Sequence, residues 1–145
     1  MRLLPGLIVV VFVAACDDFG PYVYGEFPPA GGGGANPPVI TNLHFIPESA
    51  TIGEGDGSLD VHAEFDYAYD YEDLNIVVDL FVMNDEGNEY SLRFYEWEME
   101  STGTLQYPFN VSTIRAQMYS VKARIFSEPL IYSNILQADF VVHAP

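Results

Sequence analysis

Apolar and polar side chains alternate along most of the chain from residue 39 to residue 143, and this period of two is the strongest constraint on the fold. In residues 59–67, for example, Val61, Ala63 and Phe65 lie on one side of an extended chain and polar residues on the other. Such alternation is typical of a β-strand with one buried face. The expected strands cover residues 39–45, 59–67, 74–83, 90–97, 103–111, 117–126 and 133–142. The sequence therefore predicts an all-β fold of the antiparallel sandwich type.

Turn-forming residues separate these segments. Residues 53–57 contain three glycines, and residues 84–88 read Asn-Asp-Glu-Gly-Asn, which favours a hairpin turn with Gly87 at positive φ. Residues 74–83 form the most apolar run, so we expect them to be a central strand. Only residues 112–116 suit a turn of helix.

Several segments resemble bacterial immunoglobulin-like modules. Residues 37–43 are similar to their opening strand, 85–88 to their central hairpin, 119–123 to their penultimate strand and 132–134 to their last turn. The resemblance implies an immunoglobulin-like antiparallel β-sandwich of about seven strands.

The same resemblance implies a tyrosine corner at Tyr119 and a role in spacing, adhesion or recognition. The sequence departs from antibody-type domains, because it has no cysteine pair and no tryptophan on the third expected strand. Immunoglobulin, fibronectin-III and PKD-like topologies all remain open at this stage.

Residues 1–15 have the features of a signal peptide, with Arg2 followed by an apolar run over residues 3–15. That run is too short for a membrane-spanning helix, which needs about 20 residues. It ends in Val13-Ala14-Ala15-Cys16, which resembles the lipobox of bacterial lipoproteins. The resemblance implies that the Cys16 thiol receives a diacylglycerol and that cleavage makes Cys16 the first residue. We therefore expect a lipid-anchored protein of the bacterial cell envelope.

The alternative is an ordinary leader with a chance cysteine. Two observations argue against it: Cys16 is the sole cysteine, and the chain turns acidic immediately afterwards at Asp17 and Asp18. Acidic residues at these positions resemble inner-membrane retention signals in some bacteria and surface-export signals in others. The periplasmic and the cell-surface side are both open.

Residues 16–38 are expected to form a lipidated N-terminus and a flexible Gly/Pro linker. A run of four glycines lies between two Pro-Pro pairs, and Phe19, Tyr22, Tyr24 and Phe27 precede it. The predicted organisation is a signal peptide at 1–15, this linker at 16–38 and the sandwich at 39–143.

The net charge of the chain restricts the kinds of partner that it can bind. The 145 residues include 21 Asp and Glu against 5 Lys and Arg, for a net charge of −16. Such a chain repels phosphate backbones, so we expect no nucleic-acid binding. Aromatic residues make up 14% of the chain, which excludes a disordered class.

One acidic cluster suggests a cation site. Asp66, Asp70, Glu72 and Asp73 are expected to share one inter-strand loop, and Ca²⁺ prefers several carboxylate oxygens in loops. No EF-hand spacing is present, and a plain acidic loop is the favoured interpretation. Calcium therefore remains a candidate cofactor rather than a required one.

One aromatic pair suggests a glycan site. Tyr95 and Trp97 fall on the strand face opposite Leu92 and Phe94. We expect Trp97 to be buried at a sheet edge; exposure would instead create a platform on which a sugar ring could stack.

The sequence predicts no enzyme. It contains no H-E-x-x-H or G-x-S-x-G motif, and its one cysteine is assigned to lipid. The leading hypothesis is a non-enzymatic interaction or spacer module that is held to membrane lipid through Cys16 and contacts another envelope protein or a glycan. The alternative is a calcium- or glycan-binding envelope module.

Overall fold

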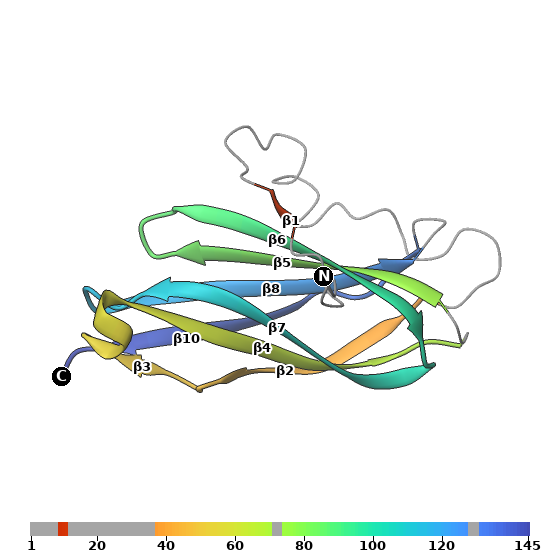
Figure 1. The fold of residues 1–145 in the computed structure, drawn as a ribbon, viewed down its shortest axis with the longest axis horizontal. Helices are drawn as coiled ribbons and strands as arrows, with labels where there is room; N and C mark the ends of the chain where they lie inside the picture. Colours follow the sequence, from red (N-terminus) through yellow and green to blue (C-terminus); the bar gives the residue numbers. More distant parts are fainter. Residues whose placement is uncertain (1–8, 12–36, 71–73, 128–130) are drawn as a thin grey trace, which may run out of the picture.

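The computed structural model describes residues 9–11, 37–70, 74–127 and 131–145, and within these ranges the chain is an all-β sandwich of two stacked sheets (Figure 1). The large sheet has the order β1-β6-β5-β8-β10-β3, with β9 paired to β8, and the small sheet has the order β2-β4-β7. The strands are β1 (Val9–Val11), β2 (Val39–Ile46), β3 (Ala50–Thr51), β4 (Ser58–Ala68), β5 (Leu74–Asn84), β6 (Glu89–Met99), β7 (Thr102–Ser112), β8 (Gln117–Ser127), β9 (Ile131–Tyr132) and β10 (Leu136–His143). A short 3-10 helix, η1 (Glu54–Gly57), precedes β4.

The seven expected strands are confirmed as β2, β4, β5, β6, β7, β8 and β10, and β5 is central because it pairs with both β6 and β8. The two-residue strands β3 and β9 were not expected, since so short a segment carries no periodicity. The helical turn expected at residues 112–116 is wrong. The chain bends there, because the Thr113 N–H and hydroxyl donate to the carbonyls of Gly57 (2.9 Å) and Glu54 (2.6 Å).

The placement of β6 decides between sandwich topologies. β6 pairs with β5 in the large sheet, whereas the fourth strand of a constant-type immunoglobulin domain joins the opposite sheet. The long strands therefore divide into three (β2, β4, β7) and four (β6, β5, β8, β10). The fold is an immunoglobulin-like sandwich, but not of the constant type.

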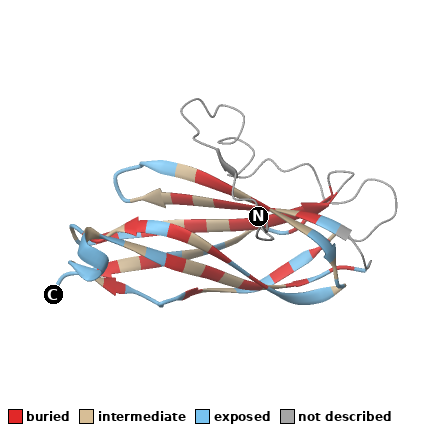
Figure 2. Cartoon of the chain, in the orientation of Figure 1, coloured by how far each residue is buried: buried red, intermediate tan, exposed pale blue. Residues whose placement is uncertain are grey.

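The core lies between the sheets, and burial alternates most regularly along β4 and β7 of the small sheet (Figure 2). Phe45 of β2, Phe109 of β7 and Phe140 of β10 meet edge to face, with ring centroids 5.6 to 6.2 Å apart. Phe94 of β6 stacks on Tyr107 of β7 at 4.3 Å. These ring contacts join the two sheets, and such aromatic pairs add stability beyond the burial of their area.

Tyr119 forms the expected tyrosine corner. Its hydroxyl accepts a hydrogen bond from the backbone N–H of Ser112 at 2.8 Å, across the connection from β7 to β8. The Gln117 side chain donates to the Ser112 carbonyl at 2.9 Å. Both bonds fasten the end of β7 to the start of β8.

The hairpin expected between β5 and β6 is confirmed. The Asn84 side-chain oxygen accepts hydrogen bonds from the backbone N–H groups of Glu86 (3.1 Å) and Asn88 (2.9 Å). Gly87 has a φ of 82°, a backbone conformation that glycine adopts without steric cost. The local sequence therefore accounts for the turn.

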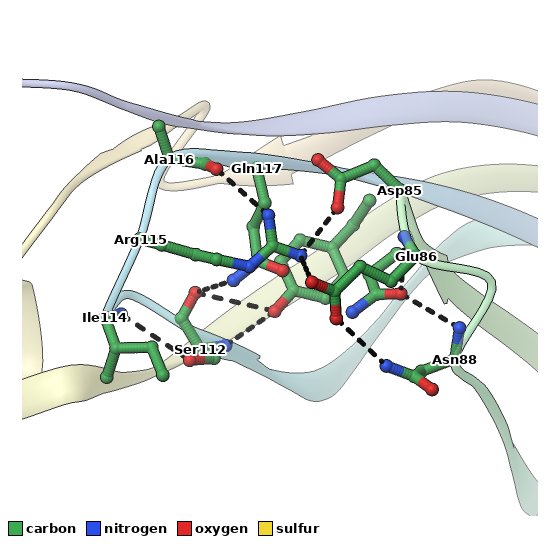
Figure 3. Close-up of polar contacts among 10 residues, drawn as sticks. Asp85, Glu86, Asn88, Ser112, Ile114, Arg115, Ala116 and Gln117 are labelled. Carbon is green, nitrogen blue, oxygen red and sulfur yellow. Dashed lines mark hydrogen bonds and ion pairs between the residues drawn. The ribbon is translucent and has the colours of Figure 1, made fainter.

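Arg115 connects this hairpin to the bend between β7 and β8 (Figure 3). Its guanidinium lies 2.7 Å from a carboxylate oxygen of Asp85 and 3.2 Å from one of Glu86. Hydrogen bonding to Arg115 lowers the pKa of Asp85. All three side chains are exposed, so the contact orients two loops more than it stabilises the fold.

The edge of the large sheet at β6 accepts a further strand. Val9–Val11 pairs antiparallel with Ser91, Leu92 and Arg93. These three valines belong to the predicted leader, and residues 1–8 and 12–36, including Cys16 and nearly all of the expected linker, lie outside the described residues.

Candidate interaction surface

A row of three charged side chains crosses the outer side of the large sheet, the side that faces away from the core. Asp79 of β5 lies directly opposite Arg93 of β6 and Arg124 of β8 in the strand register. Arg93 donates to both Asp79 carboxylate oxygens, at 2.7 and 3.0 Å, and Arg124 donates to one of them at 3.0 Å. Alternation along β5 explains the position, because Val78 and Leu80 point inward and Asp79 must point outward.

These charges are shielded although they face away from the core. The side chains of Asp79, Arg124 and Arg93 are 2%, 6% and 26% exposed, respectively. Burial by itself would lower the pKa of Arg93, but the Asp79 carboxylate raises it, and the net direction is upward. The row is thus a paired, charge-assisted network.

Aromatic rings lie beside both guanidinium groups. The Arg93 guanidinium carbon is 5.3 Å from the centre of the Phe126 ring, and that of Arg124 is 4.7 Å from Tyr132 and 6.0 Å from Phe81. Arginine over an aromatic face gains a cation–π attraction. We define the Arg–aromatic patch as Asp79, Phe81, Arg93, Lys122, Arg124, Phe126 and Tyr132.

Tyr95 and Trp97 extend this outer side along β6. Their rings are stacked, with centroids 6.5 Å apart and an interplanar angle of 15°. The prediction that Trp97 is buried is wrong, since the residue is 63% exposed. Its strand position, two and four residues from Tyr95 and Arg93, turns it outward rather than into the core.

The four candidate calcium ligands do not all lie in one loop. Asp66 lies within β4, where its carboxylate accepts hydrogen bonds from Thr104 (2.7 Å) and Asn42 (3.3 Å), and these bonds lower its pKa. Asp70 follows the end of β4, while Glu72 and Asp73 lie outside the described residues. Among the described residues, no group of three or more His, Cys, Asp or Glu side chains is arranged to hold a metal ion.

Sequence reasoning did not anticipate a histidine contact on the small sheet. The His44 Nδ1 donates to the Asn42 carbonyl at 2.9 Å, and the Nε2 lies 3.2 Å from a Glu64 carboxylate oxygen. The Asn42 carbonyl, with a further contribution from Glu64, raises the pKa of His44. The pair joins β2 to β4 on the exposed side of that sheet.

Sequence reasoning also missed the Arg–aromatic patch. One signal was available, since Asp79 is the only charge within the apolar run of β5 and basic residues occupy the outward positions of β8. The register that places Arg93 and Arg124 on either side of Asp79 is not encoded in any local pattern.

The fold and this surface define the class of protein: an all-β, immunoglobulin-like sandwich with a charged and aromatic outer face. Within the part of the chain that the structure describes, no helix is long and apolar enough to cross a membrane.

Comparison with solved structures supports the fold alone. β-Glucuronidase 2 of Bacteroides uniformis, covalently bound to cyclophellitol-6-carboxylate aziridine, aligns with a TM-score of 0.51 and 9% identity over 75% of this chain. The chain spans only 13% of the length of that enzyme. At such low identity the likeness says nothing of activity.

Two shorter proteins align over nearly their whole length. The PKD domain of an M14-like peptidase from a Thermoplasmatales archaeon gives a TM-score of 0.44 and 14% identity, covering 74% of this chain and 97% of that one. The ApaA protein of Bordetella pertussis gives 0.39 and 10%, covering 74% and 94%. No protein-family model matches the sequence, and no curated protein matches it.

Proposed function

We propose that this chain is a membrane-anchored extracytoplasmic lipoprotein whose β-sandwich acts as a non-enzymatic interaction or spacer module. The observation that carries the proposal is the position of the only cysteine, Cys16, at the end of the apolar leader and after two small residues. A thiol at that point is the acceptor that lipoprotein maturation requires. The resulting acyl chains anchor a protein firmly, because each buried methylene contributes about 0.8 kcal/mol.

The composition and packing of the sandwich are compatible with a location outside the cytoplasm. A chain with one cysteine has no intrachain disulfide, so core packing must stabilise it. The inter-sheet ring contacts of Phe45, Phe109 and Phe140 provide such packing. The net charge of the whole chain, −16, disfavours contact with anionic lipid headgroups, which favours a domain held off the bilayer by its linker.

Mass spectrometry of the native protein, purified from the membrane fraction, tests the anchor. We expect the N-terminal peptide to begin at Cys16 and to carry the added mass of a diacylglycerol. The Cys16→Ser variant is the matched control and should leave the membrane fraction. A free Cys16 thiol, or a mature chain that starts at another residue, would overturn the proposal.

A glycan-binding function is the second candidate, because the stacked Tyr95 and Trp97 rings expose a flat aromatic surface. Sugar rings stack on such surfaces through their apolar faces. If glycan binding occurs, Trp97→Ala should abolish it on a glycan array. Ile114→Ala, which removes another exposed apolar side chain at the β7–β8 bend, should leave it unchanged.

A further inference from the structure

The Arg–aromatic patch concentrates positive charge in an acidic protein. Arg93, Lys122 and Arg124 are three of the five basic residues of the whole chain, and the Asp79 carboxylate accepts hydrogen bonds from both arginines. A face of this kind attracts carboxylates and aromatic rings together, because guanidinium groups bind both.

The patch is also less exposed than the outer side of a sandwich sheet normally is. Asp79 and Phe126 are 2% and 6% exposed although both point away from the core. In a two-sheet sandwich the outward positions are generally polar and solvated. Burial of the Lys122 amine lowers its pKa in the same region. We therefore interpret the patch as a contact surface.

The start of β2 is fastened beside this patch. The Asn134 side chain accepts a hydrogen bond from the Ile40 N–H and donates one to the Ile40 carbonyl, both at 2.8 Å. Asn134 follows Tyr132 of the patch by two residues, and Tyr132 pairs with Phe126. The chain that precedes β2 therefore enters the domain next to the patch.

That preceding chain has the complementary chemistry. Residues 17–36 include no basic residue, and their charged and aromatic members are Asp17, Asp18, Phe19, Tyr22, Tyr24, Glu26 and Phe27. Fully extended, the segment spans up to roughly 66 Å, whereas an eleven-residue strand such as β5 is about 37 Å long. It is long enough to cross the sheet.

We propose that residues 17–36 bind across the Arg–aromatic patch of the same chain. Because the segment enters beside the patch, its effective concentration there is on the order of millimolar, far above that of a partner from solution. The carboxylates pair with the basic side chains, and the rings pack against Phe81, Phe126 and Tyr132. The inference does not depend on lipidation of Cys16.

Site-specific photo-crosslinking in the full-length chain, expressed with its own leader, tests the proposal. p-Benzoylphenylalanine replaces Phe81 in the patch or, as the matched control, exposed Gln106 on the outer side of the small sheet. A Glu-specific protease then separates residues up to Glu26 from residues 27–48. We expect intramolecular products with residues 17–36 from position 81, at least about fivefold above position 106, because tethering favours the local contact.

Two sets of substitutions test the chemistry. Replacing Phe19, Tyr22, Tyr24 and Phe27 by serine should remove the product, whereas replacing Gly31–Gly34 by serine should leave it. An unchanged unfolding midpoint shows that the sandwich stays folded, and Cys16→Ser should still give the product. The proposal would be overturned if position 81 crosslinked to another protein or to a second copy of the chain. It would also be overturned if position 81 gave no crosslink, or a crosslink yield no higher than that of position 106.

Discussion

The Asp79 carboxylate lies 3.0 Å from the Arg124 guanidinium, and the two side chains are 2% and 6% exposed on the side of the sheet that faces away from the core. Loss of the Asp79 carboxylate takes a hydrogen-bonded counter-charge away from the shielded Arg124 guanidinium. We predict that Asp79→Asn lowers the free energy of unfolding by about 3–5 kcal/mol, measured by urea denaturation. The exposed pair of Asp85 and Arg115 is the control, and Asp85→Asn should not move the midpoint measurably. Equal effects of the two substitutions would contradict this account of the row.

Phe140 joins three strands in the core, since its fully buried ring meets Phe45 and Phe109. Phe140→Ala removes the ring and leaves a cavity, so we expect a loss of about 3–5 kcal/mol. Ile114 is 74% exposed, and Ile114→Ala should change stability by less than about 0.5 kcal/mol. Thermal unfolding of both variants decides whether the ring cluster stabilises the sandwich.

Tyr119→Phe isolates the hydroxyl of the tyrosine corner, because the ring is retained. The Ser112 N–H would lose the acceptor that now lies 2.8 Å away. An unsatisfied buried donor costs about 1–3 kcal/mol, and because this hydrogen bond is only partly buried we expect a decrease of about 1 kcal/mol in the free energy of unfolding. A variant as stable as the parent would show that water replaces the hydroxyl at no cost.

The contact of His44 with Asn42 and Glu64 predicts a pH dependence. The pKa of His44 is raised above 6.5 in the folded state, so protonated His44 stabilises the fold most at pH values below 6.5. That contribution is lost as the pH rises through the folded-state pKa. NMR titration of the imidazole should give a pKa above 6.5, and Glu64→Gln should lower it. A midpoint at or below 6.5 in the parent protein would refute this prediction.

The position of Asp66 within β4, rather than in the expected loop, leads to an expectation about metal removal. The Asp66 carboxylate, within β4, already accepts hydrogen bonds from Thr104 and Asn42. We therefore expect EDTA to leave the unfolding temperature unchanged in calorimetry. A bound ion must stabilise the native state, so a rise in that temperature on adding Ca²⁺ would restore the calcium hypothesis.

Local pattern was enough to place the long strands. Alternation of Val61, Ala63 and Phe65 with polar neighbours fixes the inward face of β4, because side chains of a strand point to opposite sides in turn. The hairpin around Gly87 and the corner at Tyr119 are similarly local, since each depends on residues a few positions apart. These features were predicted from the sequence and are present in the structure.

The candidate surface could be identified only from the tertiary structure. Asp79 and Arg124 are 45 positions apart, and only the pairing of β5 with β8 brings them together. Exposure of Trp97 likewise depends on how β6 sits in the sheet. The amino-acid sequence by itself determined which residues extend and which side of each strand faces inward, because both follow from backbone periodicity. The tertiary structure alone decided which strands are neighbours and in what register, because long-range pairing reflects the packing of the whole core.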